Sequence, residues 1–352
     1  MPQETPIQRI LALLLALCLT PAHADLVPEG AEVEKVADGY RFTEGPALGP
    51  DGCIYFTDIP AATINRFDPE TGQTTVFRED TGNANGLMWF NGDLYMCCHG
   101  TRAVRLYPIH PNHQEVGEPD IFGNTPETVD PEDPMTLIHR LPTDETIGGS
   151  DGRRDIELTV HVAFNSPNDL AIDEAGNIYY TDPRYGNRDN METDVEGVYF
   201  SGSIDIDDPF YEQNVAVTCL DERLVRPNGI VLSPDESILY VADHGANWIY
   251  AYDIAEPGVV ENKRQFAQLN GGEGRGSDGM CVDQRGRLYA TGHGRVWAFE
   301  PTGELVATIA VGPATTNCTF AGDGRTLYIT ADHGLFRIEL NTAAPLTGEA
   351  DD

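Results

Sequence analysis

The sequence contains few positive charges, few histidines and, after residue 24, no long hydrophobic run. Lysine and arginine together number 22 against 57 aspartates and glutamates, which gives a formal net charge of −35. A surface this acidic repels nucleic acid and anionic lipid, so binding to either is disfavoured. A chain of 352 residues that is 40% hydrophobic still has enough apolar material for a substantial core. The composition is that of a folded protein with a solvated acidic surface.

The single long hydrophobic run lies at the N-terminus. Arg9 precedes an unbroken apolar stretch over residues 10–19, and Ala22-His23-Ala24 fits a signal peptidase site before Asp25. The stretch is far shorter than the roughly 20 residues that a membrane-spanning helix needs. We therefore expect residues 1–24 to be a cleaved export signal, and the mature chain to be secreted or periplasmic without a membrane segment.

Cysteine is sparse, and its positions do not suggest a zinc site. Six cysteines remain after the expected cleavage: Cys53, Cys97, Cys98, Cys219, Cys281 and Cys318. Most lie within apolar strand patterns, where free buried cysteine is common, although export would permit disulfides whose pairing the sequence does not give. The neighbours Cys97 and Cys98 share a predicted strand, so their side chains face opposite ways and do not readily hold one metal ion.

A repeated unit dominates the rest of the sequence. A turn followed by a strand centred on tyrosine occurs six times, at Tyr55, Tyr95, Tyr179, Tyr240, Tyr289 and Tyr328. Each tyrosine strand follows a short apolar segment across a Gly, Asp or Asn turn, which is typical of a β-hairpin, and further strands follow. Long amphipathic helix patterns are absent. The repeats predict an all-β fold over residues 25–345, a six-bladed β-propeller with four-stranded blades around a central channel, and an acidic tail over 346–352.

The interval between the second and third tyrosines contains an insertion, at about residues 108–160. It is rich in Pro, Asp, Glu and Gly, the composition of a long loop. Two interpretations stay open: a lid over one mouth of the channel, or a solvated acidic excursion.

Each repeat also carries an oxygen-bearing side chain ten to twelve residues before its tyrosine. These residues are Glu44, Asn85, Asn168, Asn228, Asp278 and Asn317. The innermost strands of a propeller line its channel, so equivalent positions at their starts converge on the axis at one face. Carboxylate and amide oxygens without thiolate or imidazole are the ligand set of Ca²⁺, with Mg²⁺ or Mn²⁺ possible in a wet octahedral site. Any single copy could instead be a turn residue, but six in register favour a shared site.

Histidines followed by glycine form a second series just past four of the tyrosines, at His99, His244, His293 and His333. The strand that ends there returns to the face where the innermost strand began. These side chains could therefore ring the same mouth, as a base or as substrate contacts, or could simply hydrogen-bond their own turns.

Taken together, these motifs resemble the SMP-30/gluconolactonase (regucalcin-like) family of calcium-dependent six-bladed propeller lactonases, over nearly all of the mature chain. The resemblance is carried by Glu44-Gly45-Pro46, Asn83-Ala84-Asn85-Gly86-Leu87, Asn165-Ser166-Pro167-Asn168-Asp169, Thr181-Asp182-Pro183-Arg184-Tyr185-Gly186, Pro227-Asn228-Gly229, Ser277-Asp278-Gly279-Met280-Cys281 and Leu327-Tyr328-Ile329-Thr330.

The resemblance implies roles for four residues. Glu44, Asn228 and Asp278 look like metal ligands, and Asn168 like a fourth ligand or a contact to metal-bound water and substrate. The implied reaction opens a lactone, typically a sugar lactone, with water. The implied metal is Ca²⁺, with Mg²⁺, Mn²⁺ or Zn²⁺ as possible substitutes. Because Ca²⁺ lowers the pKa of bound water less than zinc does, a base is still needed; Asp278 is the first candidate and a mouth histidine the second.

One departure from the family pattern concerns substrate binding. Some sugar-lactonase members carry an arginine two residues before the third-blade asparagine, where this chain has Ser166. Surface packing or alternative substrate contacts are both open for Arg102, Arg184 and Tyr185. The candidate substrate-binding residues are Asn85, His99, Arg102, Tyr185, His244, His293 and Asn317.

Two other functions remain open from the sequence. One is a related propeller esterase or phosphotriesterase, because the same metal centre can stabilise other oxyanions. The other is a non-catalytic propeller in which calcium is structural and the mouth binds a carbohydrate or a protein. A fold alone does not separate these functions, and the sequence does not give the oligomeric state.

Overall fold

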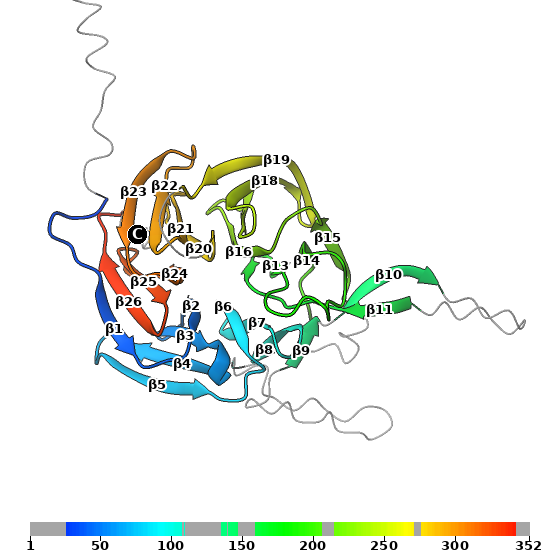
Figure 1. The fold of residues 1–352 in the computed structure, drawn as a ribbon, viewed down its shortest axis with the longest axis horizontal. Helices are drawn as coiled ribbons and strands as arrows, with labels where there is room; N and C mark the ends of the chain where they lie inside the picture. Colours follow the sequence, from blue (N-terminus) through cyan, green and yellow to red (C-terminus); the bar gives the residue numbers. More distant parts are fainter. Residues whose placement is uncertain are drawn as a thin grey trace, which may run out of the picture.

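The computed structural model describes residues 26–342 except 108, 110–134, 139, 147–158, 206–214 and 271–275. Six four-stranded antiparallel sheets form a ring (Figure 1), so the predicted six-bladed propeller is confirmed. The described residues contain no α-helix, only the 3₁₀ turn Ile59–Ala61. Within that part of the chain, no helix is long and apolar enough to span a bilayer.

Each of the first five blades is built from strands that follow one another in sequence. Blade 1 contains β2 (Thr43–Leu48), β3 (Ile54–Asp58), β4 (Thr63–Asp68) and β5 (Gln73–Arg78). Blade 2 contains β6 (Ala84–Phe90), β7 (Asp93–Cys98), β8 (Ala103–Tyr107) and β9 (Met135–Ile138). Blade 3 contains β12 (Leu170–Ile172), β13 (Ile178–Asp182), β14 (Gly197–Ser201) and β15 (Val217–Asp221).

The remaining blades complete the ring. Blade 4 contains β16 (Pro227–Leu232), β17 (Ile238–Asp243), β18 (Trp248–Glu256) and β19 (Val259–Gln268). Blade 5 contains β20 (Met280–Val282), β21 (Leu288–Gly292), β22 (Arg295–Phe299) and β23 (Leu305–Ala310). Blade 6 contains β24 (Thr315–Phe320), β25 (Thr326–Ala331), β26 (Gly334–Glu339) and the N-terminal strand β1 (Glu34–Asp38).

The two ends of the described chain meet in blade 6. Strand β1 pairs antiparallel with β26, from Glu34 opposite Arg337 to Asp38 opposite Gly334. The Glu34 carboxylate also accepts a hydrogen bond from the Arg337 guanidinium at 2.8 Å. The last blade takes its outer strand from the beginning of the chain, so hydrogen bonds between the two ends close the ring.

The hydrophobic core is divided among the six interfaces between neighbouring blades. Each of six buried clusters combines side chains from two adjacent blades. The repeated tyrosines explain this arrangement: Tyr55 packs against Leu94 and Met96 of blade 2, and Tyr289 packs against Leu327 of blade 6. The tyrosine hydroxyls of these two blades donate to the turn aspartates that precede them. The repeat therefore encodes blade packing.

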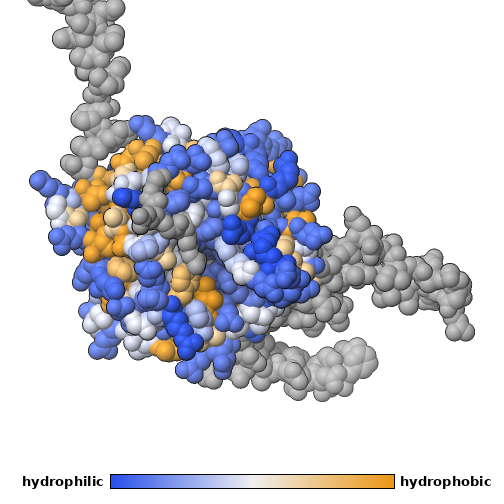
Figure 2. Space-filling view, viewed as in Figure 1, coloured by the Kyte–Doolittle hydropathy of each residue, from blue (hydrophilic) through white to orange (hydrophobic). Residues whose placement is uncertain are grey.

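Strand β7 confirms the expected opposition of its two cysteines. Cys97 belongs to the core between blades 2 and 3, whereas Cys98 belongs to the core between blades 1 and 2. The two thiols therefore face different interfaces and do not form a joint metal site. The outer rim of the molecule is largely hydrophilic in the view of Figure 2, as the acidic composition predicts.

Part of the predicted insertion at 108–160 has regular structure. Strand β9 completes blade 2, and β10 (Arg140–Thr146) pairs with β11 (Thr159–Ala163) in an extra hairpin. Figure 1 shows this hairpin at the periphery of the ring, away from the axis. Most of the segment for which a lid was considered lies outside the described residues, as do the expected signal 1–24 and the tail 346–352.

Glycines allow the innermost strands to approach one another at the axis. A Cβ atom at Gly45, Gly86, Gly229 or Gly279 would overlap atoms of the neighbouring blade or of a residue facing the axis. These four glycines belong to blades 1, 2, 4 and 5. Blades 3 and 6, which lie opposite each other in the ring, carry Asp169 and Asn317 at the same level.

Replacing the glycine in blade 5 tests this constraint. We expect Gly279→Ala to lower the stability to unfolding by about 1–3 kcal/mol, because its Cβ would overlap the side-chain amide of Asn317. The matched control is Gly202→Ala, whose Cβ would meet only the Asn177 side chain, at 3.8 Å. Denaturant titration of both variants measures the difference, and equal stability would contradict the role of glycine at the axis.

Candidate functional site at the channel mouth

The starts of the innermost strands are joined into a closed ring of hydrogen bonds. Each of the six neighbouring pairs of blades contributes at least one bond at this level. These bonds are Thr57 Oγ1 to Asn85 O (3.2 Å), Gly86 N to Asn168 O (2.8 Å), Thr181 Oγ1 to Asn228 O (2.7 Å), Gly229 N to Asp278 O (3.1 Å), Gly279 N to Thr316 O (2.6 Å) and Thr316 Oγ1 to Thr43 O (2.9 Å).

Five of the six predicted ring residues occupy equivalent positions in this ring. All five are buried: Glu44, Asn85, Asn168, Asn228 and Asp278. β-Bulges interrupt the pairing at this level, for example between Glu44 and Ala47 in blade 1. A bulge redirects side chains at the end of a strand. The structure thus brings two carboxylates and three amides to one mouth of the channel.

The prediction for the sixth ring residue, Asn317, is wrong. The backbone carbonyl of Thr316 accepts the bond from Gly279, as that of Asp278 accepts the bond from Gly229. Thr316 is therefore the ring residue of blade 6, and Asn317 lies one layer deeper along the axis. At that depth Asn317 bonds Asp169 instead of lying at the mouth, so the structure does not support its predicted contact with a substrate there.

Turn length explains the error. A backbone hydrogen bond closes the turn in blades 3 and 6. Its two residues are four positions apart in blade 3, from Asp173 N to Asn177 O, but five positions apart in blade 6, from Ala321 N to Thr326 O. The turn of blade 4, from Ser233 N to Ile238 O, also spans five. A distance of eleven residues before the tyrosine therefore misplaces the ring residue of blade 6 by one position, whereas the distance of twelve that fits blade 4 gives Thr316. Allowing for the longer turn would have identified Thr316.

Two of the mouth amides are fixed by side chains outside the ring. The Asn228 amide nitrogen donates to the Tyr185 hydroxyl oxygen at 2.8 Å. The Asn85 amide nitrogen lies 3.0 Å from His99 Nε2. In both cases the amide NH₂ is bound to the outer partner, so the carbonyl oxygen is the atom left to face the ring.

Burial and negative charge dominate the electrostatics of the mouth. Burial, followed by the charge of Asp278, raises the pKa of the Tyr185 hydroxyl well above its usual range, and Glu44 adds to this effect. Burial and the Glu44 charge raise the pKa of Asp169 to about 8. Both carboxylates therefore act on the same small volume, which favours the binding of a cation.

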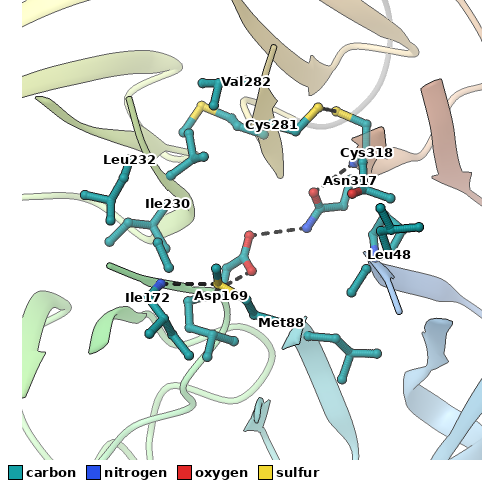
Figure 3. A pocket seen from close by; sticks show the side chains of 18 of the residues that line it. Leu48, Met88, Asp169, Ile172, Ile230, Leu232, Cys281, Val282, Asn317 and Cys318 are labelled. Atoms are coloured by element: carbon teal, nitrogen blue, oxygen red, sulfur yellow. Dashed lines mark hydrogen bonds between the residues drawn. The ribbon is translucent and has the colours of Figure 1, made fainter. Parts of the chain in front are cut away.

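Below the mouth, one hydrogen-bonded pair of side chains faces the channel axis. The Asn317 amide nitrogen donates to the Asp169 carboxylate at 3.2 Å across the axis. Beyond this pair lies a cavity of about 430 Å³ lined by all six innermost strands, which we call the far pocket. Figure 3 shows Asp169 and Asn317 facing each other among apolar neighbours such as Ile172, Ile230 and Leu48. The channel thus has a polar mouth and an apolar far end.

The histidines differ in their relation to the mouth. His99 contacts Asn85, and the ring of His244 packs edge-on against Tyr185 at 5.5 Å. His244 Nδ1 is bonded to the Ser277 carbonyl of the next blade at 3.1 Å. His293 instead pairs with Asn247, outside the ring residues. The structure therefore places His99 and His244 beside the site; a substrate contact by His293 stays a prediction.

The arginines considered as substrate contacts support a loop. Arg184 is buried and donates to the carbonyl oxygens of Asn165 and Asn187. Arg102 of blade 2 forms an ion pair with Glu192 of the same loop. This loop, residues 183–196, carries Tyr185 into the mouth. The packing interpretation fits the two arginines, whereas Tyr185 belongs to the site.

Sequence reasoning missed the aspartates that end the tyrosine strands. Asp58 accepts hydrogen bonds from the backbone N–H groups of Arg41 and Phe42. Asp182 does the same for Asn165 and Ser166, just before the ring residue Asn168. These carboxylates hold the entry of the innermost strand. The recurring Thr-Asp pair after the tyrosine was the available signal.

The donor set fits a divalent cation that prefers oxygen. Two carboxylates and the amide oxygens of Asn168 and Asn228 are buried at one level, and hard cations of the calcium type are held by such oxygens. In the described part of the chain, no group of three or more His, Cys, Asp or Glu side chains is placed to hold a metal ion. The set therefore depends on its amides and does not resemble a zinc centre.

The state of His99 can be measured. Burial, together with the charge of Arg184, lowers the pKa of His99 to about 4. The unfolded chain takes up this proton near pH 6.5, so His99 reduces stability as the pH falls from about 6.5 to 4. We expect the His99 ring, assigned in NMR spectra by comparison with His99→Gln, to titrate near pH 4. A midpoint near 6.5 would show that the ring is solvated.

Comparisons with known proteins identify the family. Residues 42–333 match the SMP-30/Gluconolactonase/LRE-like region. The gluconolactonase of Zymomonas mobilis is 27% identical over 334 residues, covering 88% of this chain and 82% of that protein. The L-arabinolactonase of Azospirillum brasilense is 37% identical over 130 residues, or 35% of this chain and 42% of that protein.

Solved structures show the same fold. A gluconolactonase from Xanthomonas campestris superposes with a TM-score of 0.67 at 25% identity, covering 90% of this chain and 91% of that one. A calcium-binding regucalcin from Agrobacterium tumefaciens gives a TM-score of 0.61 at 18% identity, with 89% and 96% covered, which is a likeness of fold alone. With its family match extending over most of its length, the chain belongs to the SMP-30/gluconolactonase/LRE-like family.

Proposed function

We propose that this protein is a divalent-metal-dependent hydrolase that opens a lactone at the channel mouth, with Ca²⁺ as the natural ion and a sugar lactone as the substrate class. The observation that carries the proposal is the buried ring itself, in which Glu44 and Asp278 meet two amides at one level of the channel. The gluconolactonase and L-arabinolactonase relatives support the reaction class, and the buried set of carboxylate and amide oxygens supports calcium. Export through residues 1–24 is part of the same proposal.

In this mechanism, the residues that would hold the ion through their oxygens are Glu44, Asn168, Asn228 and Asp278. When bound, a divalent cation supplies a Lewis acid that polarises the lactone carbonyl. The Asp278 carboxylate is the proposed base for the attacking water: it is buried at the mouth, and after burial its charge has the largest effect on the pKa of Tyr185. His99 is a weaker candidate base, since its Nε2 already accepts a hydrogen bond from the Asn85 amide nitrogen.

Tyr185 serves this proposed site as a positioning residue. Its hydroxyl oxygen accepts the bond from the Asn228 amide nitrogen, which turns the amide oxygen of Asn228 toward the ring. The ring of Tyr185 is itself held by His244 on one edge and by Arg226, whose guanidinium carbon lies 5.9 Å from the ring centroid. The loop 183–196 therefore fixes one proposed ligand without binding the ion.

Lactone hydrolysis is tested with a panel of sugar, aliphatic and homoserine lactones, with and without EDTA. Glu44→Gln and Asp278→Asn should each lower the turnover by about 100-fold or more, because each removes a buried negative charge from the ion site. Glu261→Gln, a carboxylate change on the exposed face of β19, is the matched control and should have little effect. Thermal unfolding of every variant separates lost chemistry from lost folding.

Three outcomes would count against the proposal. Full turnover after chelation and in both variants would exclude the metal mechanism. Activity on phosphotriesters or simple esters without lactone turnover would favour the related esterase. A tightly bound calcium ion without turnover of any ester would favour a carbohydrate- or protein-binding propeller.

The role of Tyr185 is tested by metal binding alone. Tyr185→Phe should weaken Ca²⁺ affinity by about 10-fold in calorimetric titration, because the Asn228 amide loses the partner that orients it. The matched control is Tyr250→Phe, where the ring packs against the Lys263 ammonium on the outer strands. Unchanged affinity in Tyr185→Phe would show that the amide is oriented by other contacts.

A further inference from the structure

Two cysteines of neighbouring blades meet at the wall of the far pocket. Cys281 lies on β20 and Cys318 on β24, and their sulfur atoms are 3.3 Å apart. Both line the pocket, and Cys281 is partly exposed to it. Figure 3 shows the two side chains pointing toward each other from neighbouring innermost strands. Neither thiol has a place in the proposed lactone chemistry, which lies beyond the Asp169–Asn317 pair.

We propose that Cys281 and Cys318 are a modification site, at which a small uncharged organic disulfide converts the two thiols into a disulfide between blades 5 and 6. A disulfide needs its sulfur atoms about 2.05 Å apart. The required approach from 3.3 Å is little more than 1 Å, and it links strands that already face each other.

The reaction is a pair of thiol–disulfide exchanges. The Cys281 thiolate attacks one sulfur of the organic disulfide, forms a mixed disulfide and releases the first small thiol. The Cys318 thiolate then attacks the Cys281 sulfur, forms the inter-blade bond and releases the second. The two protein thiols lose two electrons and two protons, and the organic disulfide gains both to become two thiols.

The surroundings of the pair select the reagent. The far pocket is lined mainly by apolar side chains, and its polar floor is the Asp169 carboxylate and the Asn317 amide. The chain also carries a formal charge of −35. An uncharged, compact disulfide is therefore favoured over an anionic one such as glutathione disulfide. Burial raises the pKa of Cys281, so the reaction should be faster at higher pH.

The new bond would stabilise the part of the ring that carries the site. Cys281 follows the ring residue Asp278 by three positions, and Cys318 follows Thr316 by two. The cross-link joins residues 37 apart in the sequence. Because a disulfide restricts the unfolded chain, we expect the melting temperature to rise by about 5 °C on oxidation.

The test incubates the full chain with bis(2-hydroxyethyl) disulfide, blocks the remaining thiols with iodoacetamide and maps the peptides by mass spectrometry. The expected product is a Cys281–Cys318 cross-link and a melting temperature raised by about 5 °C, reversed by dithiothreitol. Glutathione disulfide should form this cross-link several-fold more slowly. Exposed Cys219 serves as the internal control, since it should take up either reagent as a mixed disulfide.

Cys281→Ser and Cys318→Ser separate the two steps. In Cys318→Ser the mixed disulfide should persist on Cys281, and neither variant should gain thermal stability on oxidation. The proposal is overturned if Cys219 reacts while Cys281 and Cys318 are recovered as alkylated thiols, or if the mixed disulfide on Cys281 never resolves in the parent chain. Peptide mapping of the parent decides the matter even if a variant fails to fold.

Discussion

The closure of six innermost strands around one axis is the constraint on which the rest of this structure depends. Neighbouring strands approach so closely that their starts exchange hydrogen bonds all the way round the ring. Such an approach excludes a Cβ atom at Gly45, Gly86, Gly229 and Gly279. The residue before each of these glycines is then forced to one common level. A ring of six side chains at one level is therefore a direct consequence of closing the propeller, and the sequence fills five of the six positions with carboxylates or amides.

The same constraint divides the channel into two chemical environments. Blades 3 and 6 replace the glycine with Asp169 and Asn317, whose hydrogen bond crosses the axis. On one side of this pair lie the carboxylates and amides of the mouth, and on the other lies the far pocket with its apolar walls. The buried Asp169 carboxylate feels the charge of Glu44, which raises its pKa to about 8. The charge of Glu44 at the mouth thus acts on a carboxylate that lines the far pocket.

The fold was predictable because the tyrosine of each blade packs in the same way against the next blade. A contact that recurs in every blade requires the same residue type at regular intervals in the sequence. Five ring residues were predictable for the same reason. Asn317 was misplaced because one additional turn residue changes the register without changing the pattern. Tyr185 could be placed only by the structure, since its position depends on the contacts of Arg184 and Arg102 within a loop of no regular repeat. A repeat in the sequence reveals packing contacts that recur in every blade. It does not reveal the conformation of a loop that occurs only once.

In the proposed lactonase, substrate contacts at the mouth depend on side chains beside the ring, because this chain lacks one arginine of the family pattern. Where some family members place an arginine before the third-blade asparagine, this chain has Ser166, whose backbone is held by Asp182. A guanidinium is present nearby, that of Arg184, but its hydrogen bonds go to the carbonyls of Asn165 and Asn187. An arginine whose guanidinium donates to backbone carbonyls stabilises a loop, and those N–H groups do not bind substrate hydroxyl groups. Tyr185, His99 and His244 are then the side chains beside the mouth that the proposed function leaves to contact a lactone.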